Sequence, residues 1–170
     1  MSHIKADLKQ MKKFFNKIQL AGNTDIKEQL VLFLEGSGEE FLRIIQDEIM
    51  RKNVMDTRLL LISFSRGSSD GIWELNEGNL KLEIGTNVNY ASYVNDGHWT
   101  CKRGESKRFV PGVWQGSRFQ YISGAKTGMV LKQRWVEGAH YWETAIRIFE
   151  NVFPIIIEQK TQQLLNSYLK

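Results

Sequence analysis

The sequence Gly85-Thr-Asn-Val-Asn-Tyr-Ala-Ser-Tyr-Val-Asn-Asp-Gly-His98 lies where a strand-like pattern changes to a short helical one. Gly85 permits a sharp exit from the preceding strand because glycine has no side chain. Asn87 or Asn89 can start a short helix, since an asparagine side chain accepts a hydrogen bond from the first helical turn. We expect apolar and aromatic side chains to lock this turn onto a sheet. The residues expected to be structural are Tyr90, Ala91, Tyr93 and Val94.

The residues before this segment have the pattern of a small sheet. Leu80, Leu82 and Ile84 alternate with charged residues, which is typical of a strand with one buried face. Further strands are expected at 61–65 and 71–75, and the sequence Asn76-Glu-Gly-Asn79 is expected to form a turn. After the segment, the glycine-bounded stretches at 109–114, 119–122 and 129–136 are also predicted strands.

Helical patterns occupy both ends of the chain. An amphipathic helix is expected over 4–18, followed by a short helix through Phe33 and another over 39–53. Gly36-Ser37-Gly38 is expected to break the chain between the helix that ends at Phe33 and the helix over 39–53. Ser37 is expected to cap the helix over 39–53. A long helix is predicted from Ala139 to Leu169, with a bend or break at Pro154 because proline lacks a backbone N–H.

These patterns predict one α+β domain over residues 1–170, with N-terminal helices, a central and mostly antiparallel sheet, and a long C-terminal helix. The apolar runs are too short for a membrane span, and no signal peptide is visible. The single cysteine, Cys101, excludes an intrachain disulfide and fits synthesis in a reducing cytoplasm.

Positive charge is concentrated in one part of the chain. Residues 97–136 carry eight lysines and arginines against one acid, Glu105, so their net charge is +7, while the remaining residues carry −3. This glycine-dotted insert, at about 97–130, is therefore expected either to meet an anionic partner or to be a solvated loop. Its basic residues, with two from the flanking stretch, are Lys102, Arg103, Lys107, Arg108, Arg118, Lys126, Lys132 and Arg134.

Aromatic residues are interleaved with these basic residues. Such a mixture is typical of single-stranded nucleic-acid binding, where bases stack on rings and phosphates pair with cations. Aromatics at strand spacing are more often core or subunit interface, and Trp, Tyr and Arg are enriched in interface hot spots. The residues predicted at a partner or assembly interface are Arg103, Lys107, Arg108, Trp114 and Arg118.

Catalytic and metal-binding motifs are weak. No Gly-x-Ser-x-Gly elbow, Cys/His catalytic pair or phosphate-binding loop is present, so we expect no enzyme activity and no cofactor. His98, Cys101 and His140, with Asp96 as a fourth ligand, could bind zinc, but the second tight pair of a structural zinc site is missing. Because His140 precedes Tyr141 and Trp142, we expect it to pack beside aromatics instead.

Two segments carry a family resemblance. The first, from Gly85 to His98, resembles the "VGTNVxYAxYVExG" signature of the tail-completion and neck proteins of long-tailed bacteriophages, typified by HK97 gene product 10. The second, Arg134-Trp-Val-Glu-Gly-Ala-His-Tyr-Trp-Glu143, resembles the "RWVxGxHYxxxA" sequence of the Gram-positive prophage branch. After the signature, this chain departs from the family pattern by having the long basic insert. The signature residues expected to be structural are Gly85, Tyr90, Tyr93, Val94, Gly97, Trp135, His140 and Tyr141.

The resemblance implies a structural virion protein that completes the tail or joins it to the head connector. It further implies a ring of subunits, with six favoured, bound to other connector and tail proteins in the virion, and with no membrane partner. Before assembly, the protein would lie in the host cytoplasm. The alternatives are a nucleic-acid-binding protein that uses residues 97–136, which could also touch DNA non-specifically within a neck, and a small hydrolase or metal enzyme.

Overall fold

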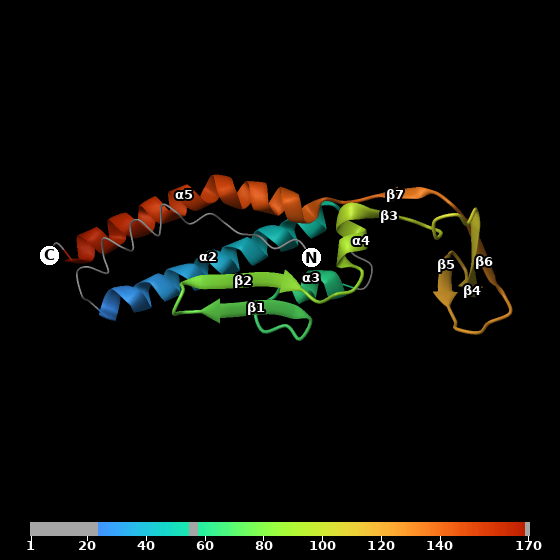
Figure 1. The fold of residues 1–170 in the computed structure, drawn as a ribbon, viewed down its shortest axis with the longest axis horizontal. Helices are drawn as coiled ribbons and strands as arrows, with labels where there is room; N and C mark the ends of the chain where they lie inside the picture. The colour runs from blue at the N-terminus through green and yellow to red at the C-terminus, as the bar shows by residue number, and fades with distance from the viewer. Residues whose placement is uncertain (1–23, 55–57, 169–170) are drawn as a thin grey trace. The chain divides into compact units, whose positions relative to one another are not determined.

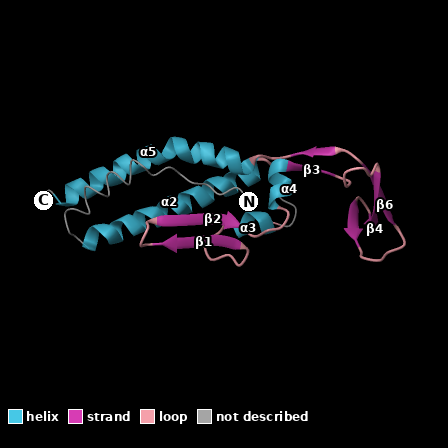
Figure 2. Ribbon diagram, in the orientation of Figure 1, coloured by secondary structure: helices cyan, strands magenta, loops and turns pink. Residues whose placement is uncertain are grey.

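The computed structural model describes residues 24–54 and 58–168. The predicted α+β class is confirmed: helices and antiparallel sheets are both present, and the chain ends in a long helix (Figures 1 and 2). The single domain expected from the sequence is built as two compact units. We call Met1–Ala91 with His140–Lys170 the helical unit, and Ser92–Ala139 the sheet unit. The helix expected over 4–18 lies outside the described residues.

The helical unit is built around two long antiparallel helices. α2 (Thr24–Arg51) and α5 (Tyr141–Tyr168) lie side by side, and the hairpin of β1 (Gly71–Asn76) and β2 (Lys81–Thr86) covers another side of α2 (Figure 1). Phenylalanine rings hold the helix pair together, because Phe33 stacks on Phe153 and Phe41 contacts Phe149. α5 continues through Pro154, so of the predicted bend or break the break is wrong, and the bend stays a prediction.

The expected break at Gly36-Ser37-Gly38 is also wrong, because α2 runs through all three residues. Ser37 does not cap a new helix, since its Oγ donates to the carbonyl oxygen of Phe33 at 2.8 Å. Gly38 has a packing role: a Cβ atom there would lie 2.3 Å from Leu82 Cδ2 and 2.8 Å from Trp73 Cη2. Contact with the hairpin therefore favours glycine at Gly38, and packing on two sides outweighs the low helix propensity of this stretch.

The strand expected at 61–65 is wrong as well, because α3 (Leu59–Ser63) is a short helix there. Gln46 on α2 stabilises its C-terminal end, since Gln46 Nε2 donates to the carbonyl oxygen of Phe64 at 3.1 Å. Ser63 Oγ donates to the carbonyl oxygen of Leu60 and accepts from Thr86 Oγ1 at 2.7 Å. The side chains that stabilise α3 come from distant parts of the sequence. The short apolar run at 61–65 carries no sign of them, so the run alone cannot distinguish this helix from a strand.

The strand predicted at 71–75 and the alternating strand around Leu82 are confirmed and form a hairpin, with its turn where the sequence indicated. Asn76 Oδ1 accepts a hydrogen bond from the backbone N–H of Asn79 at 3.0 Å, and β1 and β2 pair from Gly71–Thr86 to Asn76–Lys81. Gly85 differs from its expected role, because it lies inside β2 opposite Ile72 rather than at the exit from the strand. The short helix predicted beyond the strand is present as α4 (Ala91–Asp96).

The core of the helical unit joins all its helices. Phe64 is 1% exposed, and its ring contacts those of Tyr141 and Trp142 at the start of α5. Tyr141 is 2% exposed, and its hydroxyl donates to the carbonyl oxygen of Ala91 at 3.4 Å. The other buried hydrophobic side chains of this unit are those of Leu30, Leu34, Phe41, Leu42, Ile44, Ile45, Ile49, Leu60, Val88, Ala91, Trp142 and Ala145.

The sheet unit contains two separate antiparallel sheets. β3 (Gly97–Trp99) pairs with β7 (Trp135–Glu137), and β4 (Lys107–Gln115) lies between β5 (Arg118–Tyr121) and β6 (Gly128–Lys132). The strands expected at 109–114 and 119–122 are thus confirmed, whereas the strand expected at 129–136 is divided between β6 and β7. In the part of the chain that the structure describes, the expected central sheet is therefore three small sheets, counting the β1–β2 hairpin.

Candidate interaction surface

Close backbone contacts form the base of the sheet unit. Gly97 has a φ of +85°, and a Cβ atom there would lie 2.6 Å from the carbonyl oxygen of Val136. A Cβ atom at Gly138 would lie 2.2 Å from the carbonyl oxygen of Asn95. The N–H of Ala139 donates to the carbonyl oxygen of Val94 at 2.8 Å. The two ends of this unit are therefore held together by backbone contacts that larger residues at the two glycines would disrupt.

Two more glycines of the sheet unit are covered by phenylalanine rings from adjacent strands. A Cβ atom at Gly128 would lie 2.7 Å from the ring of Phe109, and one at Gly112 would lie 2.7 Å from the ring of Phe119. Glycine weakens a strand, and an aromatic ring placed across it restores packing. The three-stranded sheet thus uses part of its aromatic content for its own stability.

Much of the remaining apolar surface of the sheet unit is exposed. Within Ser92–Ala139, all of which the structure describes, Cys101 is the one hydrophobic residue that is buried. Trp114 is 60% exposed although its ring contacts Phe119, and Trp99 pairs edge-to-face with Trp135 while both remain exposed. The exposed large hydrophobic residues of this unit are Tyr93, Trp99, Phe109, Trp114, Tyr121, Ile122, Val130 and Trp135.

One face of the β4–β6 pair combines apolar and positively charged side chains. Lys107 is the cross-strand partner of Lys132, and two residues further along β4, Phe109 is the partner of Val130. All four are exposed, and Phe109 and Val130 are 53% and 60% exposed. On the opposite face, Val110, Met129 and Leu131 are half-buried. We call Lys107, Phe109, Val130 and Lys132 the β4–β6 face.

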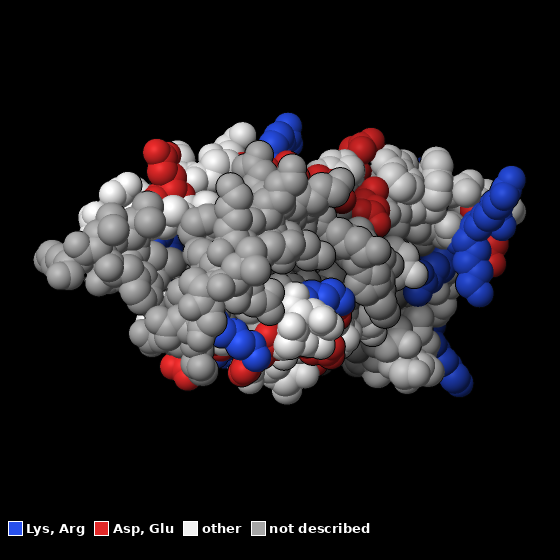
Figure 3. Space-filling view, turned by 60° about the vertical axis from the view of Figure 1, so that its left-hand side comes forward, with Lys and Arg blue, Asp and Glu red and all other residues white. Residues whose placement is uncertain are grey.

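Charged side chains of the sheet unit lack the pairing seen in the helical unit. None of its eight lysines and arginines forms an ion pair with another described residue, and all are exposed. Figure 3 shows lysine and arginine side chains that stand out from one face of the protein. In the helical unit, hydrogen bonds from Arg43 and Arg51 lower the pKa values of Glu40 and Glu48. The sheet unit therefore presents cations that are available to an external anionic group.

The five predicted interface residues all lie exposed in the sheet unit. Lys107, Arg108 and Trp114 belong to β4, Arg118 begins β5, and Arg103 lies between β3 and β4. Their role in assembly stays a prediction. The sequence pattern did not identify Phe109 and Val130 as members of one face, since their pairing depends on the register of β4 and β6. In the sequence, only the alternation of residues within each strand indicated which side chains share a face.

The signature residues divide between buried and exposed positions. Tyr141 is buried, Tyr90 and Val94 are half-buried, and Gly97 is needed for its backbone conformation. Tyr93 is 58% exposed, so the expectation that it packs the turn onto a sheet is wrong. Its ring instead contacts the ring of His98 edge-to-face. Two further signature residues, Trp135 and His140, are exposed; His140 directly precedes α5.

The side chains considered for zinc binding have other contacts. Cys101 is buried, and its Sγ donates to the carbonyl oxygen of Leu131 at 3.5 Å. His98 contacts Tyr93, and His140 Nδ1 lies 4.0 Å from Glu143 Oε2. In the part of the chain that the structure describes, no three histidine, cysteine or acidic residues gather in a way that could hold a metal ion.

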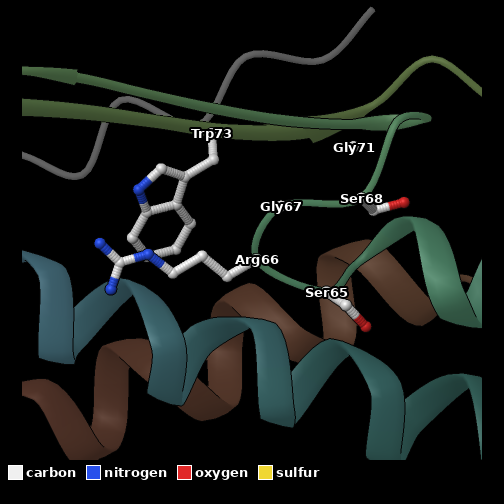
Figure 4. A pocket seen from close by; sticks show the side chains of 6 residues that line it. All are labelled: Ser65, Arg66, Gly67, Ser68, Gly71 and Trp73. Carbon is white, nitrogen blue, oxygen red and sulfur yellow. The ribbon is translucent and has the colours of Figure 1, made fainter.

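A surface pocket in the helical unit lies between α2 and the hairpin (Figure 4). It is lined by Ser65, Arg66, Gly67, Ser68, Gly71 and Trp73. The Arg66 guanidinium lies 5.0 Å from the centre of the Trp73 ring, and it forms ion pairs with Glu35 and Glu39. Because two carboxylates already neutralise this cation, the pocket offers no free positive group to a ligand.

Two proteins of Bacillus subtilis (strain 168) are similar to this chain over nearly its whole length. Protein YqbI is 45% identical over 159 residues, which cover 92% of this chain and 95% of YqbI. XkdI, a protein of the phage-like element PBSX, is 41% identical over 160 residues, covering 94% of this chain and 96% of XkdI. No protein-family model matches the chain. A search of solved structures also finds no match.

Among the described helices, none is both long enough and apolar enough to cross a bilayer.

The level of identity to YqbI and XkdI, and the coverage of this chain and of both relatives, establish a relationship across the whole fold. The chain therefore belongs to the family of YqbI and XkdI, a phage-associated family with a member in the phage-like element PBSX.

Proposed function

We propose that this protein is a structural component of a long-tailed phage or prophage particle, which completes the tail or joins it to the head connector. The observation that carries the proposal is the sheet unit, which exposes aromatic and unneutralised basic side chains on strands held by glycine contacts. Tryptophan, tyrosine and arginine are the residues most enriched in interface hot spots. The resemblance of Gly85–His98 to the tail-completion signature and the relationship to XkdI support the same role.

A non-catalytic role fits the way in which the reactive side chains are used. Ser63 is buried in a hydrogen-bonded junction between α3 and β2, and Cys101 is buried against β6. Neither side chain has the positioned base that activates a nucleophile, among the residues that the structure describes. The chemistry of the protein would then be recognition between surfaces.

Assembly as a ring is part of the proposal. In a ring, one surface of a subunit meets a different surface of the next subunit. The family resemblance favours six subunits in the virion, and the protein would lie in the host cytoplasm before assembly. We expect the isolated protein to be a monomer or weak oligomer at micromolar concentration, because a completion protein must not polymerise before the tail is finished.

The test is deletion of the gene from the phage or prophage that carries it, followed by electron microscopy of the induced lysate. Separate heads and finished tails are expected, and purified protein added to the lysate should restore joined particles. Joined particles in the deletion lysate would contradict the proposal. A lysate without tails would contradict it too, because it would place the protein at an earlier step.

A second candidate function is nucleic-acid binding by the sheet unit. The observation that favours it is the combination of eight basic side chains without ion pairs to described residues and several exposed rings. Fluorescence polarisation with labelled single-stranded and double-stranded DNA tests it. Affinity that falls steeply between about 50 and 200 mM salt would support phosphate contacts. No binding at low salt would remove this candidate.

A further inference from the structure

The strand registers contain an unusual choice of charged pairs. Among the cross-strand pairs of the described strands, two join two charged residues, and both join like charges. Glu74 lies opposite Glu83 in the helical unit, and Lys107 lies opposite Lys132 in the sheet unit. Like charges directly opposite one another destabilise a sheet, whereas opposite charges stabilise it. In neither pair does a charged residue have the opposite charge as its cross-strand partner.

We propose that the β4–β6 face of one copy of this chain packs against the outer face of the β1–β2 hairpin of a second copy. This inference rests on the proposed function, because it names the two surfaces that would form the contact within the ring. The contact is heterologous: each copy contributes its sheet unit on one side and its hairpin on the other. Such contacts close into a ring or extend as a filament according to the rotation between copies.

The charges of the two surfaces are complementary. Residues 70–86 of the hairpin region carry four acids against one lysine, Lys81, which forms an ion pair with Glu83. Glu74 and Glu77 are exposed and form no ion pair with another described residue. The sheet unit carries eight bases against three acids. Facing these surfaces across a contact would relieve the repulsion within each sheet.

The apolar residues of the two faces also match in position. On β1, Ile72 is two residues from Glu74 and is paired with Gly85, just as Phe109 is two residues from Lys107 and is paired with Val130. Trp73 and Leu82 approach Gly38 on α2, so Ile72 and Glu74 alternate to the outer side of the hairpin. The Ile72 side chain lies over Gly85, since a Cβ atom at Gly85 would be 3.3 Å from Ile72 Cδ1. The exposed Phe109 and Val130 would thus meet the apolar side chain of Ile72.

The composition of the sheet unit favours a protein partner over nucleic acid. Nucleic acid bound without sequence preference uses aromatic rings for stacking and cations for phosphates. Val130 and Ile122 are also exposed, and aliphatic side chains gain little from stacking with bases. A protein surface buries aliphatic and aromatic side chains alike, through the hydrophobic effect. The second copy is favoured as that partner because the matching acidic hairpin is present in this same chain.

The experiment uses two charge-reversed forms of the full-length chain. One carries Lys107→Glu and Lys132→Glu, and the other carries Glu74→Lys and Glu77→Lys. Sedimentation equilibrium up to the highest soluble concentration measures association of the original protein and of each form. Each form alone should associate at least about tenfold more weakly, because like charges would face one another across the contact. An equimolar mixture of the two forms should associate as strongly as the original protein, since each contact then joins opposite charges.

Matched controls separate this contact from general charge effects and from misfolding. The pair Lys102→Glu and Lys126→Glu repeats the charge change of the first form at other exposed positions of the sheet unit, and Glu150→Lys with Glu158→Lys repeats that of the second form on exposed positions of α5. Both control pairs should retain at least about half of the original association constant. Circular dichroism would verify that every form is folded.

Three results would overturn the inference: no self-association of the original protein at any concentration, weakening by the control pairs equal to that by the test pairs, or no recovery in the mixture. None of them would contradict the proposed function, which the deletion lysate tests separately. A lysate that shows no role in joining would, in turn, leave the measured association intact.

Discussion

The two units use the same kinds of residue in opposite ways. In the helical unit, the rings of Phe41, Phe64 and Trp142 are buried against one another and join α2, α3 and α5. In the sheet unit, the rings of Trp99 and Trp114 contact one neighbouring ring each and remain exposed. Burial of a large aromatic contributes strongly to folding, whereas an exposed ring contributes little until a partner covers it. The aromatic rings of the helical unit therefore stabilise the fold, whereas several rings of the sheet unit are exposed and available to a partner.

Charged residues show the same contrast. In the helical unit, Arg43, Arg51 and Arg66 each pair with a carboxylate from the same unit. The basic residues of the sheet unit have no such partner among the described residues. Substitutions in the two units should accordingly differ in their effect on the free energy of unfolding, and the predictions below run from the largest effect to the smallest.

The largest effect is expected for Phe64→Ala. This side chain is 1% exposed and contacts both Tyr141 and Trp142, so its removal leaves a cavity where α3 meets α5. The loss should be about 3–5 kcal/mol of the free energy of unfolding, as for other buried large aromatics. Urea unfolding followed by circular dichroism measures it. A loss below about 1 kcal/mol would show that the helical unit does not depend on this cluster.

The next effect is expected for Gly38→Ala, with Gly36→Ala as its matched control on the same helix. At Gly38, the new methyl group would overlap Leu82 and Trp73, so a loss of about 1–3 kcal/mol is expected from overpacking. At Gly36, a new methyl group would have no described atom within 4 Å apart from its chain neighbours and the backbone of its own helix, so alanine should stabilise the helix by about 0.5–1 kcal/mol. The same urea titration tests both. Equal effects at the two positions would mean that the hairpin does not pack on Gly38.

These glycines also show what the sequence could and could not predict. The periodic pattern identified helical residues on both sides of Gly36-Ser37-Gly38, but the glycines themselves indicated a break. Their role depends on Trp73 and Leu82, which lie far along the chain. The same limit explains the strand wrongly expected at 61–65, because Gln46 and Thr86 supply the hydrogen bonds that favour α3. The β1–β2 hairpin was predictable since its alternation and its turn are both local.

The candidate surface was predictable in kind but not in arrangement. Charge counting placed the basic residues in one insert, and the structure finds them exposed on a separate compact unit. Which side chains share a face depends on the register of β4 and β6, and a shift by one residue would exchange the two faces. Phe109 and Val130 could therefore not be joined from composition. Tyr93 shows the opposite error, since a motif residue assumed to be buried is exposed.

A smaller effect is expected for Trp114→Ala in the sheet unit. The ring is 60% exposed and contacts Phe119 edge-to-face at 5.3 Å between centroids. Loss of such a contact should change the free energy of unfolding by about 1 kcal/mol. Urea unfolding gives the global value, and hydrogen exchange of β4 and β5 amides gives the local one. A loss comparable to that of Phe64→Ala would show that the exposed rings maintain the fold, which would remove the contrast between the two units.

The smallest effect on stability is expected when Arg103, Lys107, Arg108 and Arg118 are all replaced by serine. Their side chains are exposed and form no ion pair with described residues, so the free energy of unfolding should stay within about 1 kcal/mol of the original. The effect on assembly should nevertheless be large, because charges at an interface set association rate and partner choice. In the deletion lysate, the purified variant should be soluble and folded, yet fail to join heads to tails.

The helical unit offers a matched control, since replacing Lys27, Lys52, Arg58 and Arg147 by serine removes the same number of positive charges. Because this second variant leaves the sheet unit unchanged, it should restore joined particles as well as the original protein does. Full activity of the first variant, or loss of its fold before any partner is added, would mean that the basic residues of the sheet unit are not reserved for a partner.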